Sequence, residues 1–409
     1  MREGLRRLYR SLALLGAAAF LVSCGEIVQP SSTSSISPHG PAFSVVTAQS
    51  LLSRYVALGT SNSQGVQSAG ISAPGQNAAW PAQLASRAGV PFEVPLIQDP
   101  GCGPPLLPPL AADLILVGAF GNNLVTAVMT TCAPLQSGVT LPASNLAISG
   151  SNAWDALHST VESMMLVSAR KGELYSRVLL PGQTQVTAML AKQPTFVSVE
   201  QAANEVLPAS TGRFSAATPY ASWAPVYDSI LAAVQSTGAG AVLVGLPNNA
   251  ATFPSIRRSR EFFSQWPYLL TLGISMSINC YFSSNYLFIP GYVLTLLSKA
   301  PTTATCADVP GAADYVITPN DMNAINALMA QMNAHIQAKA SENGWAYSSL
   351  EALYGLPKPS FSMYNVLFSS TPFGPYISLD GVHPSAQGQA ILATAAAQAI
   401  NATYGVAIP

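Results

Sequence analysis

Three residues of this 409-residue chain have the types and spacing needed for a nucleophilic catalytic site. Asp380 precedes His383 by three residues, directly before an apolar helical pattern near the C-terminus. Ser61 follows a short apolar run, in the turn Gly59-Thr60-Ser61-Asn62-Ser63. A serine hydroxyl becomes a good nucleophile when a neighbouring base takes its proton, and an imidazole base needs a carboxylate to orient it. The pattern therefore indicates Ser61 as nucleophile, His383 as base and Asp380 as the partner of that base.

The other histidines and serines carry less of this pattern. His158 and His335 fall within predicted helices and have no acid spaced as Asp380 is from His383. His39 lies in a segment rich in Ser and Pro that cannot build a core. Ser63 lies two residues beyond Ser61 in the same turn, and we keep it as the alternative nucleophile.

These motifs, in this order, resemble those of the SGNH or GDSL-type hydrolases. Gly59-Thr60-Ser61-Asn62 is similar to the first block of that family, and Asn145 to Gly150 is similar to the second. Ala202-Ala203-Asn204-Glu205 is similar to the third block, and Asp380 with His383 to the last. The resemblance implies a three-layer α/β/α fold and cleavage of carboxylic esters through an acyl-enzyme, without a cofactor. It also implies an oxyanion hole made of the backbone N–H groups of Ser61 and Gly150 and the side chain of Asn204.

Two residues depart from the family pattern. Thr60 stands where the family usually has Asp, and Ala202 stands where it usually has Gly. If the third block lies elsewhere, Asn248 or Asn249 is the alternative oxyanion donor. Two alternatives to an esterase therefore remain, namely an acyltransferase on the same site and a catalytically weakened surface-binding lipoprotein. The sequence leaves open whether the substrate is a lipid, acyl or acetyl ester, and it does not indicate the oligomeric state.

Short apolar runs alternate with amphipathic stretches, which is typical of an α/β protein with a mostly parallel sheet covered by helices on both faces. The predicted strands are Tyr55–Leu58, Leu114–Val117, Leu146–Ser149, Phe196–Val199, Ala241–Leu246 and Tyr315–Ile317. The predicted helices are Ala78–Arg87, Ala153–Ser168, Ala221–Ser236, Asp321–Glu342 and Ser385–Asn401. Pro384 suits the first turn of the last helix.

The N-terminus predicts export and lipid anchoring. Arginines at positions 2, 6, 7 and 10 precede an apolar run that ends at Ser23-Cys24. This pattern resembles a bacterial lipoprotein signal, which makes 1–23 the signal, Cys24 the lipidated residue and 24–43 a tether. An ordinary secretory signal is the alternative. We expect one catalytic domain over 44–409, with an apolar insertion near 262–312, and a membrane association through the anchor in the bacterial cell envelope.

The remaining cysteines and the charge limit the other functions. Cys102, Cys132, Cys280 and Cys306 allow three pairings, of which the two local pairs are the simplest. Zinc is the alternative, but the wide spacings without neighbouring histidines argue against any metal site. Only 9% of the residues are charged and the net charge is −1, so nucleic acid is excluded as a partner.

Overall fold

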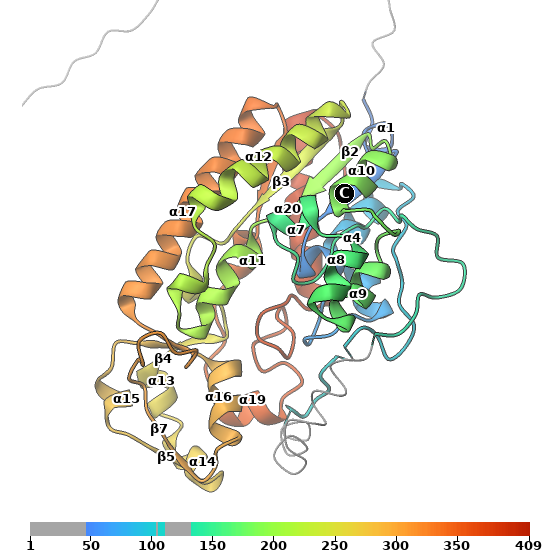
Figure 1. Ribbon diagram of the computed structural model, residues 1–409. Coiled ribbons are helices and arrows are strands. Elements are labelled where there is room, and N and C mark those ends of the chain that lie inside the picture. The colour runs from blue at the N-terminus through green and yellow to red at the C-terminus, as the bar shows by residue number, and fades with distance from the viewer. Residues whose placement is uncertain (1–45, 104, 111–131) are drawn as a thin grey trace, which may run out of the picture. The chain divides into compact units, whose positions relative to one another are not determined.

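A parallel sheet of four strands forms the centre of the computed structural model, which describes residues 46–103, 105–110 and 132–409 (Figure 1). The strands are β1 (Tyr55–Leu58), β2 (Phe196–Val199), β3 (Gly240–Gly245) and β9 (Ala346–Ser349), and they lie side by side in that order. All three pairings are parallel. The predicted strands over 55–58 and 196–199 are confirmed. The strand predicted over 241–246 is confirmed as β3, with both ends shifted by one residue.

The other three predicted strands have different outcomes. Residues 146–149 form no regular strand, although the N–H groups of Leu146 and Ile148 donate to the carbonyls of Ala57 and Gly59 beside β1. The prediction of a regular strand there is wrong because the segment turns away towards Gly150, which has a positive φ of 76°. Strand β8 (Val316–Ile317) is present but belongs to a different, smaller sheet. The predicted strand over 114–117 lies outside the described residues.

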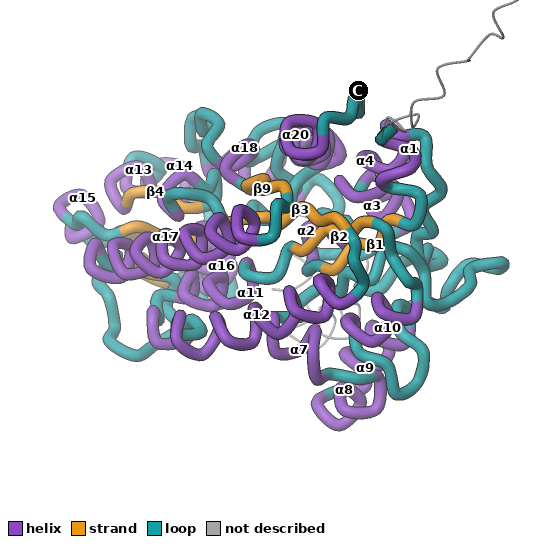
Figure 2. The backbone as a smooth tube through the Cα atoms, turned by 90° about the horizontal axis from the view of Figure 1, so that it is seen from above, coloured by secondary structure: helices purple, strands orange, loops and turns teal. Residues whose placement is uncertain are grey.

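Helices cover both faces of the sheet, as the tube view shows (Figure 2). One face carries α4 (Trp80–Ala88) and α20 (Ala386–Tyr404), and the other carries α7 (Ala153–His158), α10 (Gln185–Ala191), α12 (Tyr220–Ser236) and α17 (Pro319–Glu342). Strand residues alternate between two separate apolar clusters, so that Tyr55 and Ala57 face one layer while Val56 and Leu58 face the other. This three-layer α/β/α arrangement confirms the predicted fold class. The described chain from Val46 onward forms one compact unit.

Shorter helices connect these layers. The α-helices are α1 (Ala48–Leu51), α2 (Ser61–Gln64), α3 (Ala73–Ala78), α8 (Val161–Val167), α9 (Ala169–Ser176), α11 (Ala203–Val206), α18 (Glu351–Tyr354) and α19 (Met363–Phe368). The 3-10 turns are η1 (Leu207–Thr211), η2 (Phe214–Ala216) and η3 (Ala250–Thr252).

The predicted helix over 153–168 is two helices, α7 and α8. The break has a local cause, because the Thr160 hydroxyl accepts the N–H of Ser163 and starts a new helix after Ser159. The helix predicted from Ser385 begins at Ala386 with Ser385 as its N-cap. Pro384 therefore lies before the cap rather than in the first turn, and it pairs with Ile377 instead.

An insertion between β3 and α17 carries two small sheets. Strands β4 (Ile256–Arg258), β6 (Tyr286–Phe288) and β8 pair antiparallel, and β5 (Ile274–Met276) pairs parallel with β7 (Thr302–Ala304). Its helices are α13 (Ser259–Phe263), α14 (Trp266–Thr271), α15 (Asn279–Phe282) and α16 (Ile289–Leu297). In the part of the chain that the structure describes, no helix has both the length and the apolarity to cross a membrane.

The four cysteines beyond Cys24 form the two local disulfides. Cys102 is joined to Cys132, and Cys280 of α15 is joined to Cys306 beyond β7. Of the three pairings that the sequence allows, the structure therefore contains the simplest. The second bridge joins α15 to the chain just after β7, within the part of the insertion that carries the two-stranded sheet. Residues 1–45, which include the predicted signal, Cys24 and the whole of the predicted tether, lie outside the described residues.

Candidate active site

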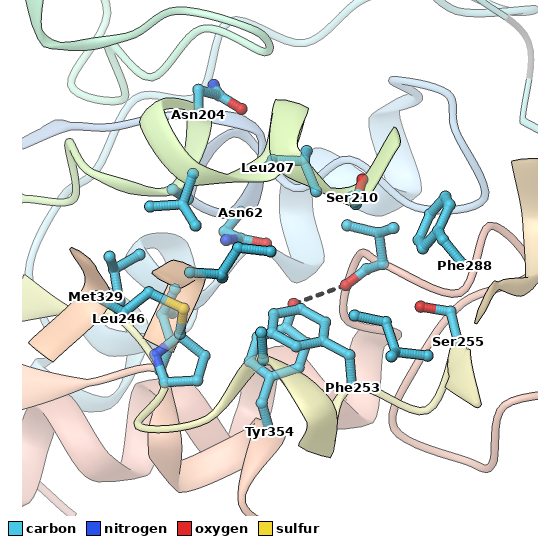
Figure 3. Close-up of a pocket in the computed structure, with 18 of the residues that line it drawn as sticks. Asn62, Asn204, Leu207, Ser210, Leu246, Phe253, Ser255, Phe288, Met329 and Tyr354 are labelled. Carbon is cyan, nitrogen blue, oxygen red and sulfur yellow. Dashed lines mark hydrogen bonds between the residues drawn. The ribbon is translucent and has the colours of Figure 1, made fainter. Parts of the chain in front are cut away.

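A cavity lies at the carboxyl edge of the central sheet, where ligands of open α/β folds are bound (Figure 3). Ser61 and Asn62 reach it from α2, the short helix after β1, and Asn204 reaches it from α11, the short helix after β2. Leu246 follows β3 and Leu350 follows β9. Each strand of the sheet therefore contributes residues to one cavity.

Ser61 is placed by a tight turn between β1 and the short helix α2. Thr60 is the extended N-cap of α2, so Ser61 is the first helical residue and its N–H has no partner within the helix. A side chain on Gly59 would lie 2.5 Å from the Ser63 side chain, which explains why this turn needs glycine. The Ser61 hydroxyl hydrogen-bonds to no described residue, and Ser61 lines the cavity.

Glu200 holds this turn, a role that was not predicted from the sequence. Its carboxylate accepts the Thr60 N–H at 3.0 Å, the Thr60 hydroxyl at 2.9 Å and the Ser63 hydroxyl at 3.1 Å. Burial raises the pKa of Glu200, while these hydrogen bonds act in the opposite direction. Glu200 is the first residue after β2, so the carboxylate ties the serine turn of one strand to the end of the next. Its position after an apolar run was the one available signal in the sequence.

Ser63 is occupied by this network rather than directed into the cavity. Its side chain is fully buried, and its hydroxyl donates to Glu200 and accepts the indole N–H of Trp80 at 3.1 Å. Ser63 is not among the residues that line the cavity. The arrangement favours Ser61 over Ser63 as the nucleophile.

Asp380 and His383 come together in the loop before α20. The Nδ1 atom of His383 lies 2.8 Å from Oδ2 of Asp380, and the backbone N–H groups of His383 and Val382 donate to Oδ1 at 2.8 and 2.9 Å. Burial raises the pKa of Asp380, but the charge and hydrogen bonds of His383 outweigh it, and the pKa falls to about 2. Asp380 is therefore ionised at neutral pH. Nε2 of His383 hydrogen-bonds to no described residue, and His383 lines the cavity.

Two unusual backbone positions support this carboxylate. Ser68 and Ala69 have positive φ values of 53° and 61°, which are uncommon for residues other than glycine. This conformation lets the N–H of Ala69 donate to Oδ2 of Asp380 at 2.6 Å, while the N–H of Ser68 donates to the Ser378 hydroxyl at 2.8 Å. The strain is therefore compensated by hydrogen bonds to the loop that carries the Asp380–His383 pair.

Gln389 joins the two halves of the site and was also missed. It lies fully buried in the first turn of α20, only six residues after His383. Its side-chain N–H donates to the Asn62 carbonyl at 2.9 Å, and its carbonyl accepts the N–H of Trp80 at 2.9 Å. Gln389 thus holds the helix after His383 against the turn of Ser61. No local sequence pattern distinguishes it from a surface glutamine.

Asn204 lines the cavity, but Gly150 does not. The side-chain N–H of Asn204 donates to the Ser151 carbonyl at 2.6 Å, which leaves its second N–H available. Gly150 is exposed and precedes Ser151, so Asn204 anchors the segment on which Gly150 lies. Ala202, where the resembled family has Gly, has a φ of −151° and needs no glycine.

Glu205 is a second buried carboxyl group next to the site. It is 2% exposed; Oε1 accepts the N–H of Ala153 at 2.7 Å, and Oε2 has no hydrogen-bond partner among the described residues. Burial raises the pKa of Glu205 to about 7. The bond to Ala153 fixes the start of α7, just beyond Gly150.

The alternative residues do not line the cavity. Asn248 and Asn249 are exposed, and Asn249 caps η3 through its side chain. His335 does have an acidic partner, because its Nε2 lies 2.7 Å from Oδ1 of Asp228. The sequence did not predict this pair, since the two residues come from different helices. His335 also meets the Tyr220 hydroxyl and does not line the cavity, so it joins α12 to α17. Within the described residues, no group of three or more His, Cys, Asp or Glu side chains could hold a metal ion.

Comparisons with known proteins give distant structural similarity. No family model and no curated protein matches the chain. Among solved structures it is similar to a catalytic mutant of Axe2, an acetylxylan esterase from Geobacillus stearothermophilus, at 12% identity, with 86% of this chain and 93% of that chain covered and a TM-score of 0.32. It is also similar to TesA (12% identity, 85% and 98% covered, TM-score 0.32). An extracellular lipase from Streptomyces rimosus matches at 14% identity, with 83% and 98% covered and a TM-score of 0.33.

Proposed function

We propose that this protein is a serine hydrolase of the SGNH type that cleaves carboxylic esters. One observation carries the proposal: Ser61 and His383 line the same cavity, and Nδ1 of His383 is held 2.8 Å from Asp380. Two chain segments more than 300 residues apart therefore bring a serine, a histidine and an ionised carboxylate to one place. Asp380 is held by four further donors, three of them backbone N–H groups, so its carboxylate is fixed in the position from which it contacts the imidazole.

In the proposed reaction, Ser61 Oγ attacks the carbonyl carbon of the ester while Nε2 of His383 takes its proton. Asp380 stabilises the imidazolium that results. The negative charge on the tetrahedral oxygen is stabilised by the N–H of Ser61 and by the side chain of Asn204, which both line the cavity. The N–H of Gly150 is the third predicted donor, although Gly150 lies outside the lining in this structure. Collapse expels the alcohol, which receives the proton from His383. Water, activated by the same histidine, then releases the acid from Ser61.

The test is turnover of nitrophenyl esters and acetylated sugars by the purified protein and three variants. Ser61→Ala and His383→Ala should each lower kcat by on the order of 10⁴-fold, because removal of one triad member disables the unit. Ser210→Ala is the matched control, since Ser210 is another serine that lines the cavity. It should retain activity within a few-fold. Residual activity of Ser61→Ala above about 1% would contradict the assignment of Ser61 as nucleophile.

A labelling experiment identifies the nucleophile independently of turnover. A fluorophosphonate forms a covalent bond with an activated serine, and peptide mass spectrometry should find the adduct on Ser61. An adduct on Ser63 would contradict the proposal. An acyltransferase would use the same residues, so the products distinguish it: release of free acid in the presence of added alcohol supports hydrolysis, and formation of a new ester in its place contradicts it.

We also propose that the protein is exported and anchored by a lipid on Cys24. Two disulfides are in keeping with an oxidising compartment outside the cytosol. Labelled palmitate should be incorporated into the full chain and not into Cys24→Ser. Equal labelling of both would refute lipidation at this residue.

A further inference from the structure

The cavity continues beyond Ser61 and His383 into a strongly apolar interior. Each of the three strands of the small antiparallel sheet contributes one side chain: Ile256 from β4, Phe288 from β6 and Ile317 from β8. Ile256 and Phe288 are direct cross-strand neighbours, so they present a continuous surface. The insertion therefore builds one wall of the cavity.

The opposite wall comes from the main fold. Ile325 and Met329 lie one turn apart on α17 and are 3% and 2% exposed. Figure 3 shows Met329 and Leu246 at one side of the cavity, with Phe253 and Tyr354 at the base. The Tyr354 hydroxyl donates to the Val382 carbonyl at 2.7 Å, so this polar group is already satisfied.

The lining is mostly apolar. Among the described residues it contains no Asp, Glu, Lys or Arg, and its polar side chains are Ser61, Asn62, Asn204, Ser210, Ser255, Tyr354 and His383. Asn62 Oδ1 and Ser255 Oγ have no hydrogen-bond partner among the described residues. A sugar or a charged group in this interior would lose more hydrogen bonds to water than these few groups can replace, which is costly, whereas a hydrocarbon chain would gain from burial. The cavity starts at the proposed nucleophile, so it fits a hydrocarbon group attached directly to the reacting ester, on its acyl or its alcohol side.

We propose that this cavity binds the acyl chain of the substrate and that the natural substrate is an ester of a fatty acid of about four to eight carbons. The inference rests on the proposed function and adds the substrate class to it. The chain length follows from the size of the cavity, which is about 80 Å³. At roughly 10–15 Å³ for each water-sized group, this volume holds about six methylene groups beyond the carbonyl carbon.

A series of nitrophenyl esters with 2, 4, 6, 8, 12 and 16 acyl carbons tests the inference on the purified protein. We expect kcat/KM to rise by up to about fourfold for each methylene buried, to peak between four and eight carbons, and to fall for 12 and 16. A maximum at two carbons, a profile without a maximum, or preference for acetylated sugars would overturn the acyl-chain inference while leaving an esterase. Failure to hydrolyse any ester in the series would instead overturn the proposed function itself.

Two methionines on α17 provide a matched pair of variants. Met329 and Met332 are both buried, at 2% and 0% exposed, but only Met329 lines the cavity. Met329→Ala should enlarge the cavity and move the preferred chain length upward by about two carbons. Met332→Ala removes the same atoms from the same helix and should leave the preference unchanged. Equal shifts in both variants, or none in either, would contradict the proposed occupant.

A substitution in the opposite direction does not depend on the stability of these variants. Ala250 lines the cavity from η3 and is 6% exposed. Ala250→Leu adds carbon atoms to the wall and should shift the preference towards two and four carbons. Unchanged preference in a folded Ala250→Leu protein would count against the inference.

Discussion

The buried carboxyl group of Glu205 should make the protein less stable as the pH rises through neutrality. Burial raises its pKa from 4.5 to about 7. Below pH 4.5 the group is protonated in both the folded and the unfolded chain. Between pH 4.5 and 7 the unfolded chain releases the proton and the folded chain retains it, so the free energy of unfolding falls over this range.

The size of the effect follows from the two pKa values. Their difference is about 2.5, and at about 1.4 kcal/mol for each pKa unit it corresponds to a loss of about 3 kcal/mol by pH 8. Glu205→Gln removes the ionisation but keeps an oxygen that can accept the N–H of Ala153. We therefore expect the variant to be similar to the wild type in stability at pH 4.5, and more stable than the wild type by about 1–3 kcal/mol at pH 8.

The assay is urea denaturation of the wild type and the variant at pH 4.5, 6, 7 and 8. The relevant quantity is the difference between the two proteins at each pH, because ionisation of all other groups cancels in it. Glu342→Gln is the control, since Glu342 is 59% exposed on the last turn of α17 and its side chain pairs with Lys339 on the surface. Its difference from the wild type should stay within about 0.5 kcal/mol at every pH. A Glu205→Gln protein that loses stability in parallel with the wild type would refute the reasoning.

Substitutions at three further places test the roles of Glu200, of Asn204 and of the disulfide of the insertion. Glu200→Ala leaves the buried N–H of Thr60 without an acceptor and should lower the free energy of unfolding by about 1–3 kcal/mol and kcat more than tenfold, whereas Glu200→Gln should retain most of both. Asn204→Ala should lower kcat by about 10²–10³-fold with little change in KM. If kcat instead stays normal and the free energy of unfolding falls by about 1 kcal/mol, Asn204 acts only structurally, through its hydrogen bond to Ser151. Replacing Cys280 and Cys306 together by Ser opens a 26-residue loop and should lower the free energy of unfolding by about 3 kcal/mol, measured by urea denaturation. An unchanged free energy of unfolding would contradict this expectation.

The parts of the fold that could be predicted from the sequence are those with a local cause. The strands over 55–58 and 196–199 are buried on both faces, so each is a short run of apolar residues, interrupted only by Ser198, that ends at a turn. Strand β9 has the sequence Ala-Tyr-Ser-Ser and could not be recognised in this way. Its place is fixed by pairing with β3 and by α20, which packs on it from the far end of the chain.

In the candidate site, too, local contacts could be predicted from the sequence and long-range contacts could not. Asp380 and His383 were found because their hydrogen bond joins residues three apart. Gln389 could not be found, because its contact with Asn62 joins residues 327 apart and depends on how α20 packs. An apolar insertion was expected near 262–312, but of the three strand side chains that it contributes to the cavity only Phe288 lies in that range, while Ile256 and Ile317 lie outside it.

Thr60 shows why a departure from a family pattern cannot be judged at one position. In the sequence it was support for a weakened site, because a threonine replaces the usual acid beside the serine. In the structure its N–H and hydroxyl both donate to the carboxylate of Glu200, which enters from the neighbouring strand. The turn thus keeps a buried acid, supplied by a residue 140 positions away. Because the serine turn is held in this way, the replacement at position 60 does not by itself indicate a weakened site, and turnover of the ester series by the wild-type protein decides between a working site and a weakened one.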